Sequence, residues 1–139
     1  MGRSTFVFEI LEHTADVGIR ASGPTLVAAF AETARGMFSI IGEAGGCESS
    51  LEVEISAEGH DRESLLHGFL SELLFLHEVE GVFLTGLDLT VDGLTVKGTG
   101  RGCPSSGARI SAEVKAVTYH RLKVVQTPDG WECEVLFDI

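Results

Sequence analysis

The sequence predicts an α+β fold in which two helices pack on one face of a mostly antiparallel β-sheet. Two segments carry apolar residues at the three-to-four-residue spacing of helices, whereas most other apolar residues alternate with polar ones as in half-buried strands. After the second helix the predicted strands follow one another through short turns, which favours antiparallel pairing. The chain has 139 residues, and 44% of them are hydrophobic. It is therefore expected to form a single domain, residues 1–139, with a core that needs no disulfide bonds.

The first half of the chain is predicted to form two strands, a helix and a third strand. Residues 4–10 are rich in aromatic and β-branched side chains, and residues 13–23 continue as a bend and a short strand. Thr25 is a suitable N-cap for a helix that stops at Gly42. The apolar residues of this helix recur at helical spacing: Leu26, Phe30, Ala34, Met37 and Ile41. Residues 51–57 alternate between apolar and polar side chains, which predicts a half-buried strand.

The second half begins with a helix and continues with β-strands. Asp61 is a suitable N-cap, Gly81 is a suitable end, and the residues between them carry a broad apolar stripe. The stripe consists of Leu66, Phe69, Leu70, Leu73, Leu74 and His77. Asp92-Gly93 is expected to be the two-residue turn of a β-hairpin. Residues 108–126 then predict one long bent strand or two shorter ones.

The last predicted strand, residues 131–139, has two different faces. A turn at residues 128–130 precedes it. The residues of one face are Trp131, Cys133, Val135, Phe137 and Ile139, and those of the other are Glu132, Glu134, Leu136 and Asp138. The apolar face is expected to anchor the end of the chain, which leaves Asp138 pointing away from the core. Because the strand–helix–strand order occurs twice, the pattern also suggests a duplicated unit.

Net charge restricts the partners of the chain. It has 21 acidic and 10 basic residues, with a net charge of −11 at pH 7. Such a chain is repelled by phosphate backbones, so strong direct nucleic-acid binding is not expected unless positive charge is gathered locally. The charge suits cations or a basic protein partner, although solubility alone is a sufficient reason for it. No apolar run approaches the roughly 20 residues of a membrane span, and the N-terminal segment lacks a signal-peptide pattern, so a cytoplasmic location without membrane contact is expected.

Cysteine and glycine patterns predict neither a nucleophile site nor a phosphate loop. Cys47, Cys103 and Cys133 are odd in number and lack zinc-ligand spacing, so reduced thiols are expected rather than a disulfide or a zinc centre. No local signature identifies Cys103 and His120 as the nucleophile and base of a thiol enzyme. Residues 98–107 are rich in glycine, but they lead into a strand and not a helix. A flexible connection is therefore favoured there over a phosphate-binding loop.

Both ends of the chain carry candidate metal ligands. His13 and Asp16 belong to the segment HTAD, where the chain leaves its first strand. Asp16 is either a turn-capping aspartate, which is a common role, or a ligand. If the two ends meet, Asp16, Asp138 and the carboxylate of Ile139 form an all-oxygen cluster, which suits Ca²⁺ or Mg²⁺ better than zinc.

Two further polar residues lie within apolar segments. Glu72 interrupts the stripe of the second helix and is either exposed at the edge of the stripe or turned towards the polar cluster. Lys115 lies in a predicted strand, where it either points into solvent, guards a sheet edge, or pairs with a carboxylate or a partner. The sequence leaves these alternatives open, and His13, Glu72 and Lys115 are retained as auxiliary or partner-facing candidates.

Four separated stretches together resemble the archease family. They are EHTADVGIRASGPTL, ESLLHGFLSELLFL, EVKAVTYHRLKV and the terminal WECEVLFDI. They occur in the family's order, and the resemblance covers essentially the full chain. The motifs HTAD, KAVTYH and terminal DI are specific in combination, although each alone is weak.

The resemblance implies a fold of two strand–helix–strand–strand modules and an accessory, non-catalytic role. Archeases act with an RtcB-type RNA ligase in tRNA splicing and RNA repair, where they promote guanylylation and multiple turnover of the ligase. The family binds a divalent cation, typically Ca²⁺, and the matching residues in this chain are Asp16, Asp138 and Ile139. Lys115 matches the lysine of the KAVTYH motif, which the resemblance places near the functional surface.

One segment departs from the family pattern. Arg101 stands where archeases commonly carry an acidic residue, and the following residues up to position 110 contain no histidine. This departure keeps a second function open, in which the same scaffold acts as a ligand-binding or chaperone-like module for another client. A stand-alone metal-dependent hydrolase is a third class.

Overall fold

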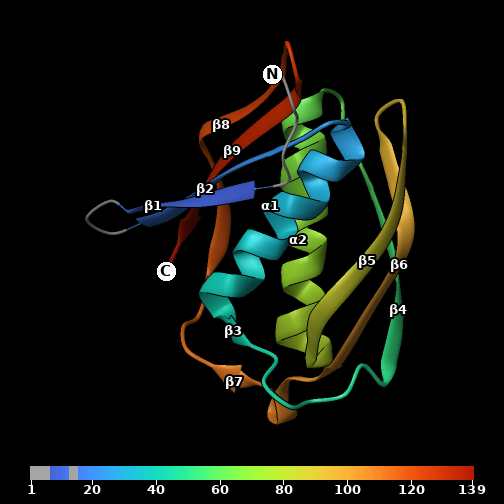
Figure 1. Ribbon diagram of the computed structural model, residues 1–139, viewed down its shortest axis with the longest axis vertical. Helices are drawn as coiled ribbons and strands as arrows, with labels where there is room; N and C mark the ends of the chain where they lie inside the picture. The colour runs from blue at the N-terminus through green and yellow to red at the C-terminus, as the bar shows by residue number, and fades with distance from the viewer. Residues whose placement is uncertain (1–6, 13–15) are drawn as a thin grey trace.

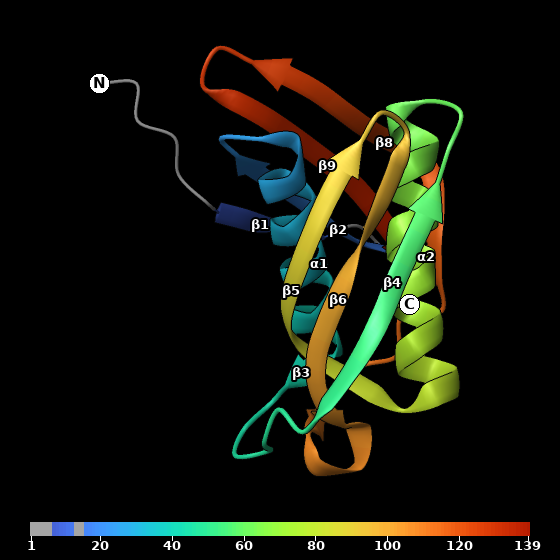
Figure 2. The same cartoon turned by 90° about the vertical axis from the view of Figure 1, so that its right-hand side faces the viewer.

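The two helices form a layer between two antiparallel sheets (Figures 1 and 2). The computed structural model describes residues 7–12 and 16–139. The larger sheet has the order β1-β2-β9-β8, with β1 (Val7–Glu12), β2 (Asp16–Gly23), β8 (Ala116–Thr127) and β9 (Gly130–Asp138). The smaller sheet has the order β4-β6-β5, with β4 (Leu51–Glu58), β5 (Val82–Asp92) and β6 (Thr95–Pro104). The remaining elements are the short pair β3 (Gly42–Glu43) and β7 (Arg109–Ile110), and the 3₁₀ turn η1 (Ser105–Gly107).

The α+β class predicted from the sequence is confirmed, since two helices pack against strands that pair antiparallel throughout the described ranges. The sequence did not predict that the strands divide into two sheets. Helix α1 (Leu26–Ile41) contacts β2 and β9 of the larger sheet and β5 of the smaller one. Helix α2 (Arg62–Glu80) contacts β8 on one side and β4 on the other. Each helix is therefore covered by both sheets.

The predicted caps determine where the helices begin and end. The side chain of Thr25 accepts a hydrogen bond from the backbone N–H of Ala28 at 3.1 Å, and the N–H of Gly42 donates to the carbonyl of Phe38. At α2, the Asp61 carboxylate accepts from the N–H of Ser64 at 2.7 Å. That hydrogen bond lowers the pKa of the Asp61 carboxyl. The helix ends at Gly81 in the left-handed region, at φ 68°, which favours glycine.

Aromatic rings join the helix layer to the larger sheet. Phe30 of α1 and Phe69 of α2 stack with their ring centroids 5.6 Å apart, and both are fully buried. Phe137 of β9 is also fully buried and belongs to the same cluster of buried side chains. This cluster includes residues from both helices and both sheets, so the helices could not be separated from either sheet without exposing it.

Several strands follow the predicted pattern with changes at their ends. Along β4 the side chains alternate between partly or fully buried and exposed, as expected. Residues 108–126 form two strands, β7 and β8, which was one of the two alternatives. The hairpin turn lies one residue later than predicted, because Asp92 is paired with Thr95 and the two turn residues are Gly93 and Leu94. Gly93 has φ 63°, so the positive backbone angle that the turn requires falls on glycine.

Residues 98–104 belong to strand β6, which contradicts the prediction of a flexible connection. This strand is the centre of the smaller sheet and is hydrogen-bonded on both sides. A Cβ atom added at Gly100 would lie 2.9 Å from Cδ2 of Leu84 and 3.0 Å from Cδ1 of Ile55. Glycine is therefore needed for close packing at this position, and its presence does not signal mobility.

Cys47 and Cys103 form a disulfide, which contradicts the prediction of reduced thiols. Cys47 lies between β3 and β4, Cys103 lies near the end of β6, and their Cα atoms are 6.1 Å apart. The two residues are 56 positions apart in the sequence, so a search for locally spaced pairs could not find them. Cys133 is a free thiol. Burial raises its pKa to about 12, so it stays protonated and unreactive.

We expect Phe69→Ala to lower the free energy of unfolding by about 3–5 kcal/mol, because the substitution leaves a cavity in the middle of the helix layer. Phe75→Ala is the matched control, since Phe75 lies on the same helix and is 49% exposed. Its cost should stay below about 1 kcal/mol. Urea unfolding followed by circular dichroism measures both values. Equal losses for the two variants would contradict the assignment of Phe69 to the core.

Candidate functional site

Strand β9 lies between β2 and β8, and this pairing brings three distant parts of the sequence together (Figure 1). Asp16 of β2 lies directly opposite Asp138 of β9, and Ala116 of β8 lies on the other side of Asp138. Directly opposite residues of an antiparallel pair point to the same face of the sheet. Since Phe137 points into the core, both aspartates lie on the face that points away from the helices.

Lys115 lies beside this pair of aspartates. Its backbone N–H donates to the carbonyl oxygen of Asp138 at 2.7 Å, and its side chain is exposed. The sequence placed Lys115 within a strand, but β8 begins one residue later, at Ala116. The exposed position agrees with one of the alternatives, a lysine that points into solvent. Lys115 and Asp138 are both exposed, and the backbone hydrogen bond makes them neighbours.

The two aspartates have the chemistry of a cation site. Asp16 is half-buried and Asp138 is exposed. Like charges on directly opposite residues destabilise a sheet, and a cation held between them removes the repulsion. Carboxylate oxygens are the ligands that Ca²⁺ and Mg²⁺ prefer. Within residues 7–12 and 16–139, no group of three or more His, Cys, Asp or Glu side chains could hold a metal ion. A cation at this place would therefore find two carboxylate side chains, Asp16 and Asp138, among the described residues.

Three further residues were predicted to belong to the site: Ile139, Glu72 and His13. Ile139 follows Asp138 directly, but it is 41% exposed, so it does not anchor the chain end in the core as its alternation predicted. Phe137, which is fully buried, is the last residue of the chain that packs in the core. Glu72 is half-buried on α2 and does not join Asp16 and Asp138 in a metal-binding group. His13 lies outside the described residues.

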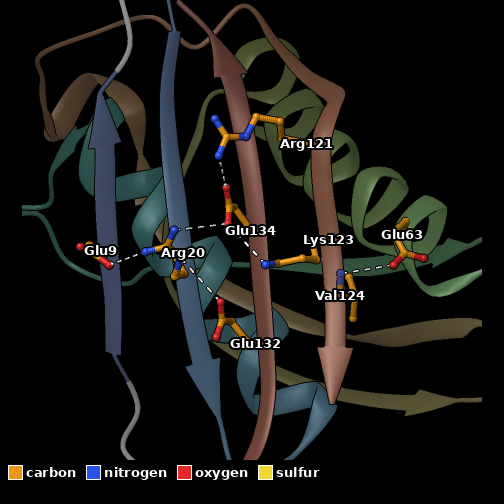
Figure 3. A network of polar contacts seen from close by, with 8 residues as sticks. All are labelled: Glu9, Arg20, Glu63, Arg121, Lys123, Val124, Glu132 and Glu134. Atoms are coloured by element: carbon orange, nitrogen blue, oxygen red, sulfur yellow. Dashed lines mark hydrogen bonds and ion pairs between the residues drawn. The ribbon is translucent and has the colours of Figure 1, made fainter. Parts of the chain in front are cut away.

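A second polar centre, which the sequence did not predict, lies four residues back along β9 (Figure 3). Glu134 is only 4% exposed, yet cations approach it from both neighbouring strands. Its carboxylate lies 3.5 Å from Arg20 of β2, 3.7 Å from Arg121 of β8 and 3.9 Å from Lys123 of β8. A buried carboxylate is costly unless it is paired, and three cations around it meet that requirement.

Strand β8 is irregular next to this centre. Thr118 is opposite Leu136 and Lys123 is opposite Glu134, so four residues of β8 face the single residue Val135 of β9. Arg121, within this bulge, has φ 60° and is the only non-glycine residue with positive φ in the described part of the chain. Bulges bend a strand and re-aim its side chains, and they are enriched next to functional sites.

Helix α2 holds β8 on both sides of the bulge. The carboxylate of Glu63 accepts a hydrogen bond from the backbone N–H of Val124 at 3.3 Å (Figure 3). One turn later, Nε2 of His67 donates to the carbonyl of Val117 at 2.9 Å. The His67 ring also stacks on Tyr119, with centroids 3.9 Å apart and planes 8° from parallel. The bulge is therefore held in place by side chains of α2 as well as by the sheet.

The sequence does contain a signal for the bulge. Val117 and Val124 both point into the core, and they are seven positions apart in the sequence. In a regular strand, residues an odd number apart lie on opposite faces. The odd spacing therefore requires one or more extra residues between the two valines, and a bend within residues 108–126 was the only irregularity that the sequence pattern predicted.

The model of the Archease protein family (MTH1598/TM1083) matches residues 8–139. The chain belongs to the archease family. Protein archease of Pyrococcus furiosus is 40% identical over 139 residues, which cover 95% of this chain and 98% of that protein. Protein archease of Methanopyrus kandleri is 36% identical over 138 residues, which cover 95% of this chain and 99% of that protein. The resemblance seen in the sequence motifs is confirmed.

Solved structures agree with this archease fold. The solution structure of protein 1598 of Methanobacterium thermoautotrophicum matches with a TM-score of 0.80 at 32% identity, and the match covers 95% of this chain and 98% of that one. The crystal structure of an archease, a possible chaperone, from Thermotoga maritima matches with a TM-score of 0.61. At 23% identity that second likeness concerns the fold alone. None of the helices in the described ranges has the length and apolar character needed to span a membrane.

Proposed function

We propose that this archease is a non-catalytic accessory protein that binds a divalent cation and activates an RtcB-type RNA ligase in tRNA splicing and RNA repair. The observation that carries the proposal is the direct pairing of Asp16 with Asp138 across β2 and β9. The sheet places these carboxylates together on a solvent-facing surface, although 122 positions separate them in the sequence. Ca²⁺ is the ion that the family resemblance implies, and carboxylate donors suit it.

In this proposal the α-carboxylate of Ile139 joins the side chains of Asp16 and Asp138 as a ligand. A bound cation supplies positive charge that cancels the repulsion between the paired carboxylates and orders the end of β9. Lys115, held at Asp138 by its backbone, presents a positive side chain at the rim of the same surface. The residues thus form a surface that a partner protein can recognise, and no nucleophile or general base takes part.

The charge of the whole molecule supports a protein partner with a basic surface. At a net charge of −11, the archease is attracted to the positive channel that an RNA ligase needs for its substrate. Such attraction raises the rate of association and falls steeply with ionic strength. A cytoplasmic location fits this role.

A chaperone-like module for another client is the second candidate. The observation that favours it is Arg101, which stands in β6 where archeases commonly carry an acid. The Thermotoga maritima protein is called a possible chaperone, although only its fold is comparable. Affinity capture from native extract separates the two candidates, because recovery of the RNA ligase as chief partner contradicts the chaperone-like one.

Calcium should stabilise the folded protein. At a free Ca²⁺ concentration of about 100 times the dissociation constant, binding to the folded state alone adds about 2.7 kcal/mol, or roughly 10 °C in melting temperature. Asp16→Asn should remove most of this shift. Asp88→Asn, the same change at an exposed position on the smaller sheet, should leave it intact. Differential scanning calorimetry with Ca²⁺ and with excess chelator measures the shift, and its absence from the unmodified protein contradicts the metal site.

The archease should raise the turnover of its cognate ligase when cleaved RNA is in excess. We expect Asp138→Asn to lose most of this stimulation, because it removes a ligand while keeping the size of the side chain. Asp88→Asn should retain it. Multiple-turnover ligation with GTP and Mn²⁺ is the measurement. If the unmodified archease leaves ligase turnover unchanged, the accessory role is wrong.

A C-terminal tag should weaken calcium binding, whereas an N-terminal tag should not. The tag converts the α-carboxylate of Ile139 into a neutral amide, which removes one charged ligand but leaves Asp16 and Asp138 in place. Isothermal titration with Ca²⁺ compares the two tagged proteins. Equal affinities would show that the α-carboxylate of Ile139 is not a ligand, without bearing on the other two residues.

A further inference from the structure

We propose that the bulged edge of β8 binds single-stranded nucleic acid, with Tyr119 as the platform for one base and with Arg121 and Lys123 contacting neighbouring phosphates. The site is separate from the two aspartates, and binding there is a property of this chain without its ligase. The proposal rests on the proposed function only for the expectation that the natural strand is RNA.

Positive charge is concentrated in this segment although the chain is acidic. Residues 114–128 contain Lys115, Arg121 and Lys123 and no aspartate or glutamate. Net charge predicts that the archease does not bind nucleic acid strongly, but a local gathering of cations is the condition that permits a local contact. Residues 114–128 meet that condition in the sequence of a chain whose net charge is −11, and two of their cations share the single carboxylate of Glu134 in the sheet.

Arg121 in the bulge and Lys123 directly after it are open to solvent, whereas their shared partner Glu134 is buried. The side chains of Arg121 and Lys123 are 52% and 48% exposed, and that of Glu134 is 6% exposed. Their distances to Glu134, 3.7 and 3.9 Å, exceed the 2.7–2.9 Å of a charge-assisted hydrogen bond. The buried carboxylate of Glu134 therefore contacts both cations and leaves about half of each side chain open to solvent. Phosphate oxygens can approach from the exposed side without displacing Glu134.

Tyr119 has the geometry of a stacking platform. One face of its ring lies on His67 at a centroid distance of 3.9 Å, yet the residue remains 61% exposed. The exposed area must therefore come from the remaining face and edges of the ring. His67 is fixed by its hydrogen bond to Val117, so the pair is ordered before any ligand arrives. Stacking on an aromatic ring is how single-stranded nucleic acid is held without sequence preference.

The backbone conformation of the bulge supports a functional role. Arg121 at φ 60° is in a region that is unfavourable for side chains other than glycine, asparagine and aspartate. Such strained positions cluster at binding sites. The bulge faces Val135 of β9, which is three residues along that strand from Asp138, or about 10 Å.

The test is fluorescence anisotropy with a labelled ten-nucleotide oligouridine, the purified archease and excess chelator, without ligase. We expect saturable binding that weakens with salt, with a slope of log K against log salt near −1.4 for two phosphate contacts. A DNA strand of matching length should bind similarly, and a duplex of the same length more weakly, because its bases are not free to stack. Since neither ligase nor Ca²⁺ is present, failure of this test leaves the proposed function untouched.

Four variants separate stacking from charge. Tyr119→Ala should weaken binding about fivefold to a hundredfold, whereas Tyr119→Phe should bind like the unmodified protein. Arg121→Asn, which suits the positive φ, and Lys123→Gln should each reduce the salt slope by about 0.7. Lys97→Gln is the matched control, because Lys97 is exposed on the smaller sheet. Thermal melting checks that each variant is folded.

Three results would overturn the proposal. The first is absence of saturable binding to the oligouridine by the unmodified protein. The second is unchanged affinity for Tyr119→Ala together with loss for Arg121→Asn, which indicates a purely electrostatic surface suited to an acidic protein partner. The third is an equal effect of Lys97→Gln and Lys123→Gln, which indicates non-specific attraction to any lysine of the chain.

Discussion

The pairing of β9 with β2 and β8 is the constraint on which the polar face of the larger sheet depends. Every residue of that face takes its neighbours from this register: Asp138 meets Asp16, and Glu134 meets Arg20 and Lys123. A slip by one residue would turn Asp138 and Glu134 into the core and expose Phe137. Burial of unpaired carboxylates is among the most costly changes a core can suffer. The apolar and the charged residues of β9 therefore specify the same register.

Local patterns predicted most elements of the fold, and contacts between distant segments account for what was missed. Thr25, Asp61 and Gly81 were correctly identified as helix ends because capping depends on a few neighbouring residues. The disulfide of Cys47 with Cys103 and the central place of β6 depend on sheet order, which periodicity does not reveal. The division into two sheets was missed for the same reason, since alternation shows that a strand has a buried face but not which sheet it joins.

The candidate site was predictable only in part. The meeting of Asp16 and Asp138 followed from a family resemblance, and the register supplies its physical basis. The centre around Glu134 was missed because an alternating strand places glutamate on its polar face, where exposure is the ordinary expectation. Its burial results from long side chains of two neighbouring strands that close over it. The net charge of the chain was also a poor guide to β8, because it does not show that residues 114–128 contain three cations and no acidic residue.

Strand β8 is longer than regular pairing with β9 requires. If three of the four residues between Thr118 and Lys123 were absent, β8 could pair with β9 without interruption and Val117 and Val124 would remain in phase. Such a chain would gain backbone hydrogen bonds between β8 and β9. It would also lose the positive φ angle that Arg121 now adopts. The sheet alone therefore does not favour the observed conformation. Hydrogen bonds that link Glu63 and His67 of α2 to the backbone of β8 stabilise it instead. The conformation of this edge of the sheet therefore depends on the helix that packs behind it.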